Sequence, residues 1–352
     1  MRLINTKQWR MIGALMSVAI CAMLIWGWDD DSKKQYFLDE GNVFGTYYNI
    51  RYEAKKSLTK EIKAAFVDFD NSLSLFNPHS ILSAVNANRD TTTNAAFESM
   101  FAEAARVNAL SDGAFDITVA PLVNYWGFGI KKSNSEAVQQ CNGPTAERSN
   151  SISGLLDFVG FDKVQLIDHK VIKSDRRVQL DAGAVAKGQA CDMIAEVLMQ
   201  NGCENYLVDI GGEVVAHGVN QQGGPWRIGI SKPNLNNEGA QEVLQDILAV
   251  TDICMATSGN YRNYYYSNGE RRSHTIDPRT GYPVQHSLLS ATVVSSSCMR
   301  ADALATACMV LGTDKALDMI DRAQDAACYL IVAENDSLVV IQSPNWCDFV
   351  QK

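Results

Sequence analysis

Residues 289–311 read LSATVVSSSCMRADALATACMVL and join two patterns in one short stretch. Residues 289–295 contain β-branched side chains and predict a strand. Residues 301–311 are apolar apart from a few polar positions and are long enough to predict a helix. A strand that leads into a helix is typical of folds that combine both kinds of element. This stretch therefore predicts an α+β fold.

The rest of the chain carries the same two patterns. Apolar residues recur at helical spacing from Ile62 to Leu73, and Asn94 is suited to cap a helix over residues 95–110. We also expect a helix at 58–76, 185–200 and near 315–323, strands at 41–52, 177–180, 205–209, 226–231 and after the last helix, and a loop at 132–153. No internal repeat is visible. The sequence thus predicts an α+β fold with mixed sheets and flanking helices.

Composition limits the classes of function. The chain has 352 residues, of which 46% are hydrophobic and 20% charged, so it can bury a large core. Its formal net charge is −9 and its pI is about 5.1. A non-specific nucleic-acid binder needs clustered Lys and Arg to contact phosphates, and no such cluster occurs.

The N-terminus differs from the rest of the chain. Three basic residues precede an uncharged stretch at residues 11–28, which is followed by three consecutive aspartates. This length is close to the ~20 residues that span a bilayer, and the basic side is expected to be cytoplasmic. We predict a membrane anchor or signal segment at residues 1–28 and a spacer at 29–40. The rest of the chain is then expected on the periplasmic side of the cytoplasmic membrane.

Two alternatives for this segment stay open. A cleaved signal peptide has a similar charge pattern, although no Ala-x-Ala-like site follows the apolar run. A lipid-modified Cys21 is also conceivable, but Ile20 is bulky where a lipoprotein cleavage site has a small residue.

Nine cysteines are scattered along the chain without a C-x-x-C pair or a Cys/His spacing. A zinc site is therefore not expected. Cys191 and Cys308 lie in apolar stretches of expected helices, where we expect buried free thiols. The sequence does not assign disulfide pairs.

Neither a Walker P-loop nor the Rossmann glycine pattern occurs, so a phosphate site must be built differently. Candidates are four glycine-containing segments, at residues 181–188, 209–213, 257–261 and 274–281. In the first, a strand is expected to end at Asp181 and a helix to begin a few residues later. Anions are favoured at a helix N-terminus, and Lys187 adds a positive charge there. A purely structural strand-turn-helix junction fits the same residues.

Asp302 and Thr306 are four residues apart on an expected helix, which places a carboxylate and a hydroxyl on the same face. Hard oxygen donors of this kind suit Mg²⁺. The alternative is that Asp302 caps the helix and Thr306 faces solvent. His274 precedes a turn with Pro278 and Gly281, a context that is ordinary on its own.

In their order along the chain, these segments resemble the FAD:protein FMN transferase (ApbE) family. The matching motifs are residues 115–123 followed by Trp126-Gly127-Phe128, then residues 181–187, 206–212, 226–230, 256–261, 274–281 and 301–306. The resemblance covers residues 41–312 and implies one T-fold-like catalytic domain, which we place at residues 41–352.

This resemblance implies an enzyme that uses Mg²⁺ and moves the FMN half of FAD onto a Thr or Ser hydroxyl of another protein, with release of AMP. By the same resemblance, Asp302, Thr306 and the backbone carbonyl of Ala184 would be metal ligands. The expected FAD-lining residues are Phe44, Phe76, Trp126, Gly127, Phe128, Asp181, Lys187 and Ile276. Phe44 and Phe76 depart from the Met and Tyr that are common in the family.

We take Asp302 and His274 as the catalytic residues, with His274 as the hypothetical base, because a neutral imidazole is available near pH 7. The acceptor is expected to be a flavin-carrying redox subunit at the same membrane. The chain itself has no Ser/Thr-Gly-Ala-Ser/Thr stretch of the kind such transferases modify. Two other functions stay open: a Mg²⁺-dependent FAD pyrophosphatase, and a flavin-binding protein without catalysis.

Overall fold

The computed structural model describes residues 33–129, 145–233, 243–261, 264–267, 270–335 and 337–350. The described residues from Tyr36 onward form one compact unit. The expected anchor at residues 1–28, Cys21 and Cys141 lie outside the described residues. No helix within the described ranges is long and apolar enough to cross a membrane.

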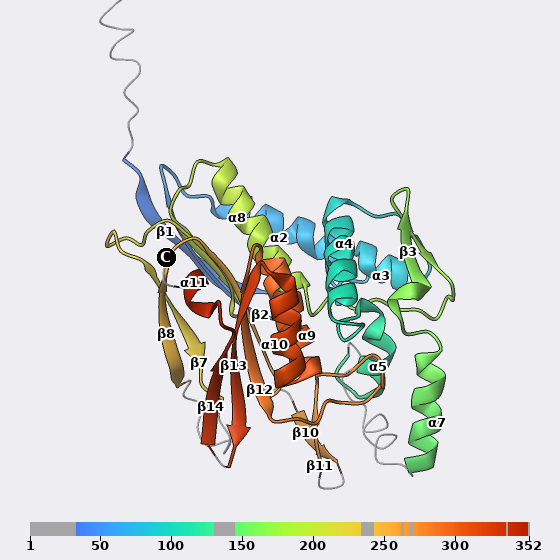
Figure 1. Cartoon of the computed structure of the whole chain (residues 1–352). Coiled ribbons are helices and arrows are strands. Elements are labelled where there is room, and N and C mark those ends of the chain that lie inside the picture. The colour runs from blue at the N-terminus through green and yellow to red at the C-terminus, as the bar shows by residue number, and fades with distance from the viewer. Residues whose placement is uncertain are drawn as a thin grey trace, which may run out of the picture. The chain divides into compact units, whose positions relative to one another are not determined.

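The main feature of this unit is an eight-stranded sheet in the order β1-β2-β5-β6-β9-β12-β13-β14 (Figure 1). Its strands are β1 (Gln35–Val43), β2 (Thr46–Ala54), β5 (Tyr206–Ile210), β6 (Glu213–His217), β9 (Ile253–Gly259), β12 (Leu288–Ser295), β13 (Ala326–Glu334) and β14 (Ser337–Gln342). Every pair in it with a described register is antiparallel. The predicted α+β class, with sheets and flanking helices, is confirmed.

Helices cover one face of this sheet. They are α2 (Thr59–Leu73), α4 (Ala95–Leu110), α8 (Ala186–Gln200), α9 (Cys298–Leu311) and α10 (Thr313–Ala323). Alternate residues of β5 show why the sheet has two faces: Tyr206 and Val208 join the main core under the helices, whereas Leu207 packs against a second core. The second core is closed by the hairpin of β7 (Trp226–Ser231) and β8 (Leu244–Val250).

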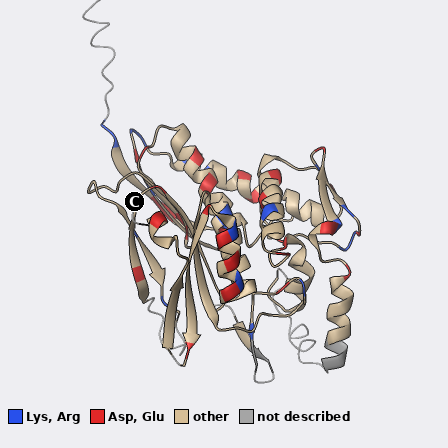
Figure 2. Ribbon diagram, viewed as in Figure 1, with Lys and Arg blue, Asp and Glu red and all other residues tan. Residues whose placement is uncertain are grey.

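Charged residues distinguish the outer helix α10 from the central strands of the sheet. In Figure 2, Asp, Glu, Lys and Arg mark α10, whereas β12 and β13 carry almost none. On α10, Ala316, Met319 and Ile320 face the core, so its charged residues occupy the solvent side. All eight residues of β12 are buried. This pattern places β12 in the centre of the fold.

Smaller elements complete the unit. They are α3 (Ile81–Asn86), η1 (Ile117–Val119), α5 (Ala120–Tyr125), α7 (Thr145–Leu156), η2 (Phe161–Lys163), β3 (Val164–Ile167), β4 (Lys170–Lys173), β10 (Tyr264–Ser267), β11 (Glu270–Ser273) and α11 (Trp346–Val350).

Most of the predicted elements are found, and the predicted cap of α4 is confirmed. The side chain of Asn94 accepts a hydrogen bond from the backbone N–H of Phe97 at 3.0 Å. All seven cysteines in the described residues are free thiols, and Cys191 and Cys308 are buried as expected.

Three predicted elements are corrected. The single strand expected at residues 41–52 is a hairpin, because Phe44 and Gly45 both adopt positive φ, 51° and 76°, and reverse the chain. Its first strand, β1, begins at Gln35, within the expected spacer. The second half of the loop expected at 132–153 lies in α7.

The third correction concerns residues 177–180, which form no strand. The side chain of Asn86 takes the place of a neighbouring strand there. Its Oδ1 accepts from the N–H of Leu180 at 2.7 Å, and its Nδ2 donates to the carbonyl of Leu180 at 2.8 Å. A distant side chain thus satisfies the backbone groups that would otherwise need a strand partner.

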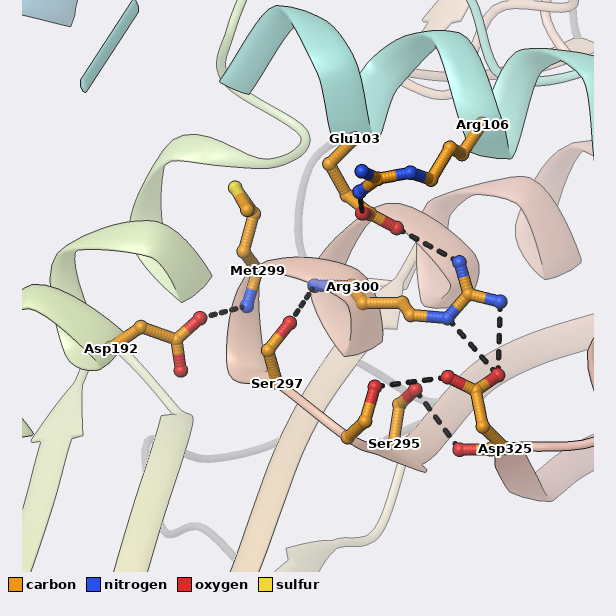
Figure 3. Close-up of polar contacts among 9 residues, drawn as sticks. Glu103, Arg106, Asp192, Ser295, Ser297, Met299, Arg300 and Asp325 are labelled. Atoms are coloured by element: carbon orange, nitrogen blue, oxygen red, sulfur yellow. Dashed lines mark hydrogen bonds and ion pairs between the residues drawn. The ribbon is translucent and has the colours of Figure 1, made fainter. Parts of the chain in front are cut away.

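The N-terminus of α9 is held by polar contacts from three other segments (Figure 3). Asp192 accepts from the N–H of Met299 at 2.8 Å, and Ser297 caps the helix by accepting from the N–H of Arg300 at 3.2 Å. The guanidinium of Arg300 contacts Asp325 and Glu103, both at 2.9 Å. The side chain of Glu103 is only 6% exposed, so this ion pair is largely removed from water.

We predict that Arg300→Ala lowers the free energy of unfolding by about 2–4 kcal/mol, because it removes one partner of a largely buried ion pair. The matched control is Arg106→Ala. Arg106 also contacts Glu103, but its side chain is 67% exposed, and its loss is expected to cost about 1 kcal/mol or less. Urea unfolding of both variants measures the difference. Equal losses would contradict the central role of Arg300.

Candidate active site

A cavity of about 710 Å³ opens between α8, α9, β9, the β7–β8 hairpin and the segment at residues 274–278. Eight of the residues singled out from the sequence line it: Phe128, Asp181, Ala184, Lys187, His274, Ile276, Asp302 and Thr306. They come from positions as far apart in the sequence as Phe128 and Thr306. The fold therefore gathers most of the expected site into one space.

Helix α9 presents Asp302 and Thr306 to this cavity from successive turns. Asp302 is only 3% exposed, and its Oδ2 accepts a hydrogen bond from the N–H of Gly188 at 3.0 Å. The hydroxyl of Thr306 lies 3.2 Å from that of Ser258 on β9. Ser297, not Asp302, caps α9. The alternative role of Asp302 as a cap is therefore wrong, and Thr306 is half-buried at the cavity wall.

Gly188 sets the position of Asp302. A Cβ at Gly188 would collide with the carbonyl oxygen of Cys298 and lie 2.8 Å from the Cβ of Asp302. Only glycine therefore lets α8 approach α9 so closely. This close approach brings the N–H of Gly188 onto the Asp302 carboxylate and places Lys187, one residue earlier, beside it.

Lys187, which is half-buried, forms an ion pair with the buried Glu213 at the start of β6. Its Nζ lies 2.5 Å from Oε1 of Glu213, whose side chain is 1% exposed. The other oxygen, Oε2, has no hydrogen-bond partner among the described residues. Burial raises the pKa of Glu213, and the positive charge of Lys187 opposes this shift. Glu213 is the last residue of the glycine-containing segment 209–213, but no role was expected of it.

The charges in this part of the cavity do not balance. Burial raises the pKa of Asp302, and the charge of Lys187 opposes this effect. Burial alone would lower the pKa of Lys187, but Asp302 and Glu213 together raise it above its ordinary value. Two carboxylates thus share one ammonium group. A further cation would relieve their mutual repulsion.

The donors present fit Mg²⁺ rather than a softer metal. Asp302 offers a carboxylate and Thr306 a hydroxyl, and Ala184 lines the same cavity. No group of three or more His, Cys, Asp or Glu within the described ranges is arranged to hold a metal. Because Mg²⁺ prefers octahedral coordination by oxygen, an ion at this position would need further oxygen ligands from a bound substrate or from water.

Asp181 shapes the turn that enters α8. Its Oδ1 accepts from the N–H of Gly183 at 2.7 Å, and its own N–H donates to the carbonyl of Ile117 at 2.6 Å. Burial raises the pKa of its carboxyl group. The turn places Ala184 and Lys187 next to the cavity, as the glycine-containing segment predicts.

One part of the cavity wall is aromatic. The ring of Phe128 lies 6.3 Å from that of His274 and 5.3 Å from that of Tyr265, measured between ring centroids. Ile276 is buried beside them. The turn that follows is fixed by Arg279, whose Nε donates to Oδ1 of Asp277 at 2.9 Å. A flat ring system can therefore pack against this wall.

The other four expected FAD-lining residues are not among those that line the cavity. Trp126 is buried, and its indole N–H donates to the carbonyl of Gly281 at 2.7 Å, so it supports the wall from behind. Gly127 turns the chain between Trp126 and Phe128 with φ of 79°. Phe44 packs on Phe66 and Phe69. Phe76 is 74% exposed.

Several cavity residues were not expected from the sequence. They are polar or aromatic residues on strands and loops: Tyr47, Asp116, Asp209, Glu213, Arg227, Ser258 and Tyr261, of which all but Glu213 line the cavity directly. Asp209 and Ser258 belong to two of the glycine-containing segments that are candidates for a phosphate site. A signal for these two residues was therefore present in the sequence. For Tyr47 and Arg227, the alternation of side chains along a strand predicts which face of the sheet each residue lies on. It does not predict that this face lines a cavity.

Comparison with known proteins agrees with this geometry. The model of the ApbE family matches residues 44–330. The chain is 38% identical over 318 residues to the FAD:protein FMN transferase of Haemophilus influenzae, covering 86% of this chain and 88% of that one.

Solved structures are similar too. The flavin transferase ApbE from Vibrio cholerae superimposes with a TM-score of 0.78 at 31% identity, covering 90% of this chain and 100% of that one. The apo flavinyl transferase ApbE of Pseudomonas stutzeri gives a TM-score of 0.77 at 30% identity, covering 91% and 98%. The sequence, the fold and the cavity thus lead to one conclusion: this chain belongs to the ApbE family.

Proposed function

We propose that this chain transfers FMN from FAD to a Thr or Ser hydroxyl of an acceptor protein, releases AMP, and needs Mg²⁺ to do so. The observation that carries the proposal is the cavity itself. In a member of the ApbE family, it brings the oxygen donors of Asp302 and Thr306 together with Lys187 and His274.

The cavity has the parts that a dinucleotide substrate requires. Its volume, about 710 Å³, is in the range of small-molecule sites. The wall at Phe128 and Ile276 suits a flat ring, and the Asp181 turn presents the start of α8 to a pyrophosphate. Lys187 supplies positive charge to the same group, while Glu213 holds its ammonium in place.

In the proposed reaction, the acceptor hydroxyl oxygen forms a bond to the FMN phosphorus, and the bond from that phosphorus to the bridging oxygen breaks. AMP leaves with that oxygen. Mg²⁺, held by Asp302, Thr306 and the carbonyl of Ala184, would neutralise the charge that develops during this exchange. His274 accepts the hydroxyl proton on a ring nitrogen. Phe128 limits the positions of the His274 ring by packing near it.

We place the enzyme at the periplasmic face of the cytoplasmic membrane, with a flavin-carrying redox subunit as acceptor. The charge pattern at the N-terminus supports this location. Basic residues precede the apolar run at residues 11–28, and three aspartates follow it. Support for a separate acceptor is the lack of a Ser/Thr-Gly-Ala-Ser/Thr stretch in this chain.

The proposal predicts covalent transfer. Purified full-length protein is incubated with FAD, Mg²⁺ and a peptide that contains Ser-Gly-Ala-Thr. We expect flavin bound covalently to the peptide and AMP in equal amount, detected by mass spectrometry and chromatography, and neither product in the presence of EDTA. Free FMN with AMP but no labelled peptide would instead indicate a pyrophosphatase. Bound FAD without any AMP would indicate a binding protein.

A second prediction concerns the base. His274→Ala is expected to slow flavin transfer by about 10²-fold or more while FAD still binds, because the acceptor hydroxyl loses its proton acceptor. The control is His79→Ala, an exposed histidine outside the cavity. Single-turnover rates and FAD fluorescence measure the two effects. A near-normal rate in His274→Ala would remove this residue from the mechanism.

A further inference from the structure

A second cavity, of about 1010 Å³, lies beside the first and has no role in the reaction described so far. Strands β1, β2 and β5, the start of β7 and the loop at residues 220–222 form its walls. Four residues, Tyr47, Leu207, Asp209 and Arg227, line both cavities, so the two spaces meet there. We call this second cavity the groove.

We propose that the groove binds the extended segment of the acceptor protein that carries the reacting hydroxyl. This inference rests on the proposed transferase function. A protein hydroxyl can reach the phosphates of FAD only if its own chain is held close to the cavity. The groove leads to the cavity at the four shared residues.

The edge strand of the main sheet forms part of the groove wall. Strand β1 is the first in the sheet order and has one neighbour, β2, within the described residues. Tyr36, Phe37 and Leu38 all line the groove although they are consecutive. Because successive side chains of a strand point to opposite faces, the backbone of β1 must form part of the wall. Unpaired N–H and C=O groups of an edge strand can pair with an extended chain of many sequences.

The loop wall is preformed and polar. Asn220 closes the loop by donating from Nδ2 to the carbonyl of Pro225 at 2.6 Å and accepting at Oδ1 from the N–H of Gln222 at 2.9 Å. Gln221 and Gln222 are exposed, and their side-chain amides make no hydrogen bond within the part of the chain that the structure describes. Each amide can both donate to and accept from a peptide backbone.

Tyr36 fixes β1 against this loop, so the groove does not need to form on binding. Its hydroxyl donates to the carbonyl of Val219 at 2.7 Å, and its ring meets that of Trp226 edge-on at 6.4 Å. Two apolar side chains of the groove wall remain open to solvent, Leu38 at 50% and Tyr47 at 49%. They offer contact area for side chains of the bound segment.

The charges of the groove favour a polypeptide over a free nucleotide or a lipid headgroup. Arg51 and Arg227 are matched by Glu40 and Asp209. A site for a phosphate-rich ligand would carry an excess of positive charge. A balanced set beside amide and aromatic side chains is suited to a neutral peptide.

The test uses full-length protein, FAD, Mg²⁺ and the Ser-Gly-Ala-Thr peptide, and it measures KM separately for the peptide and for FAD. Leu38→Asp is expected to raise the KM for peptide about tenfold, and Gln222→Ala about threefold, with the KM for FAD unchanged. The matched control is Ile167→Asp: Ile167 is also 50% exposed, but it lies on β3, outside both cavities.

If the wild-type protein is active and both groove variants keep a normal KM for the peptide, the proposed role of the groove is wrong. The proposed transferase function would not be affected by that result. If Leu38→Asp does not fold, Gln222→Ala decides alone. Failure of the wild-type protein to label the peptide would contradict the proposed transferase function. The proposed role of the groove would then fail as well, because it rests on that function.

Discussion

The close approach of α8 and α9 at Gly188 is the constraint on which the site depends. A side chain larger than hydrogen at this position would meet the backbone of Cys298. With glycine there, one backbone N–H reaches Asp302, and Lys187 comes to lie between Asp302 and Glu213. Two buried acidic groups and one half-buried basic group thus lie together beside the cavity. Water cannot screen their charges well, so their balance depends on what binds.

The rest of the fold keeps these two helices in register. Asp192 on α8 accepts from the N–H groups of Cys298 and Met299, so the same pair of helices is joined a second time, at the start of α9. Arg300 then ties α9 to α4 and to Asp325. On its other side, α9 packs on the fully buried strand β12. A catalytic carboxylate is held most accurately by such rigid elements.

Local patterns in the sequence predicted the five helices that cover the sheet, the Asn94 cap and the Asp302–Thr306 pair, because spacing along a helix fixes which residues share a face. Contacts between distant segments could not be predicted in this way. Asn86 replaces a strand partner for Leu180, and Glu213 pairs with Lys187. In both cases, no local sequence pattern indicates which distant residue is the partner. Positive φ at Phe44, which turned an expected strand into a hairpin, is also unusual for such a residue.

The measurement that tests the central claim most directly is flavin transfer by Asp302→Asn, which keeps the shape of the side chain but removes its charge. The control is Asp314→Asn, an exposed carboxylate in the first turn of α10. If the buried acidic site drives the reaction, Asp302→Asn folds normally by circular dichroism and loses about 10²-fold or more of the transfer rate, while Asp314→Asn stays near wild type. A folded Asp302→Asn protein with a wild-type rate would contradict the account.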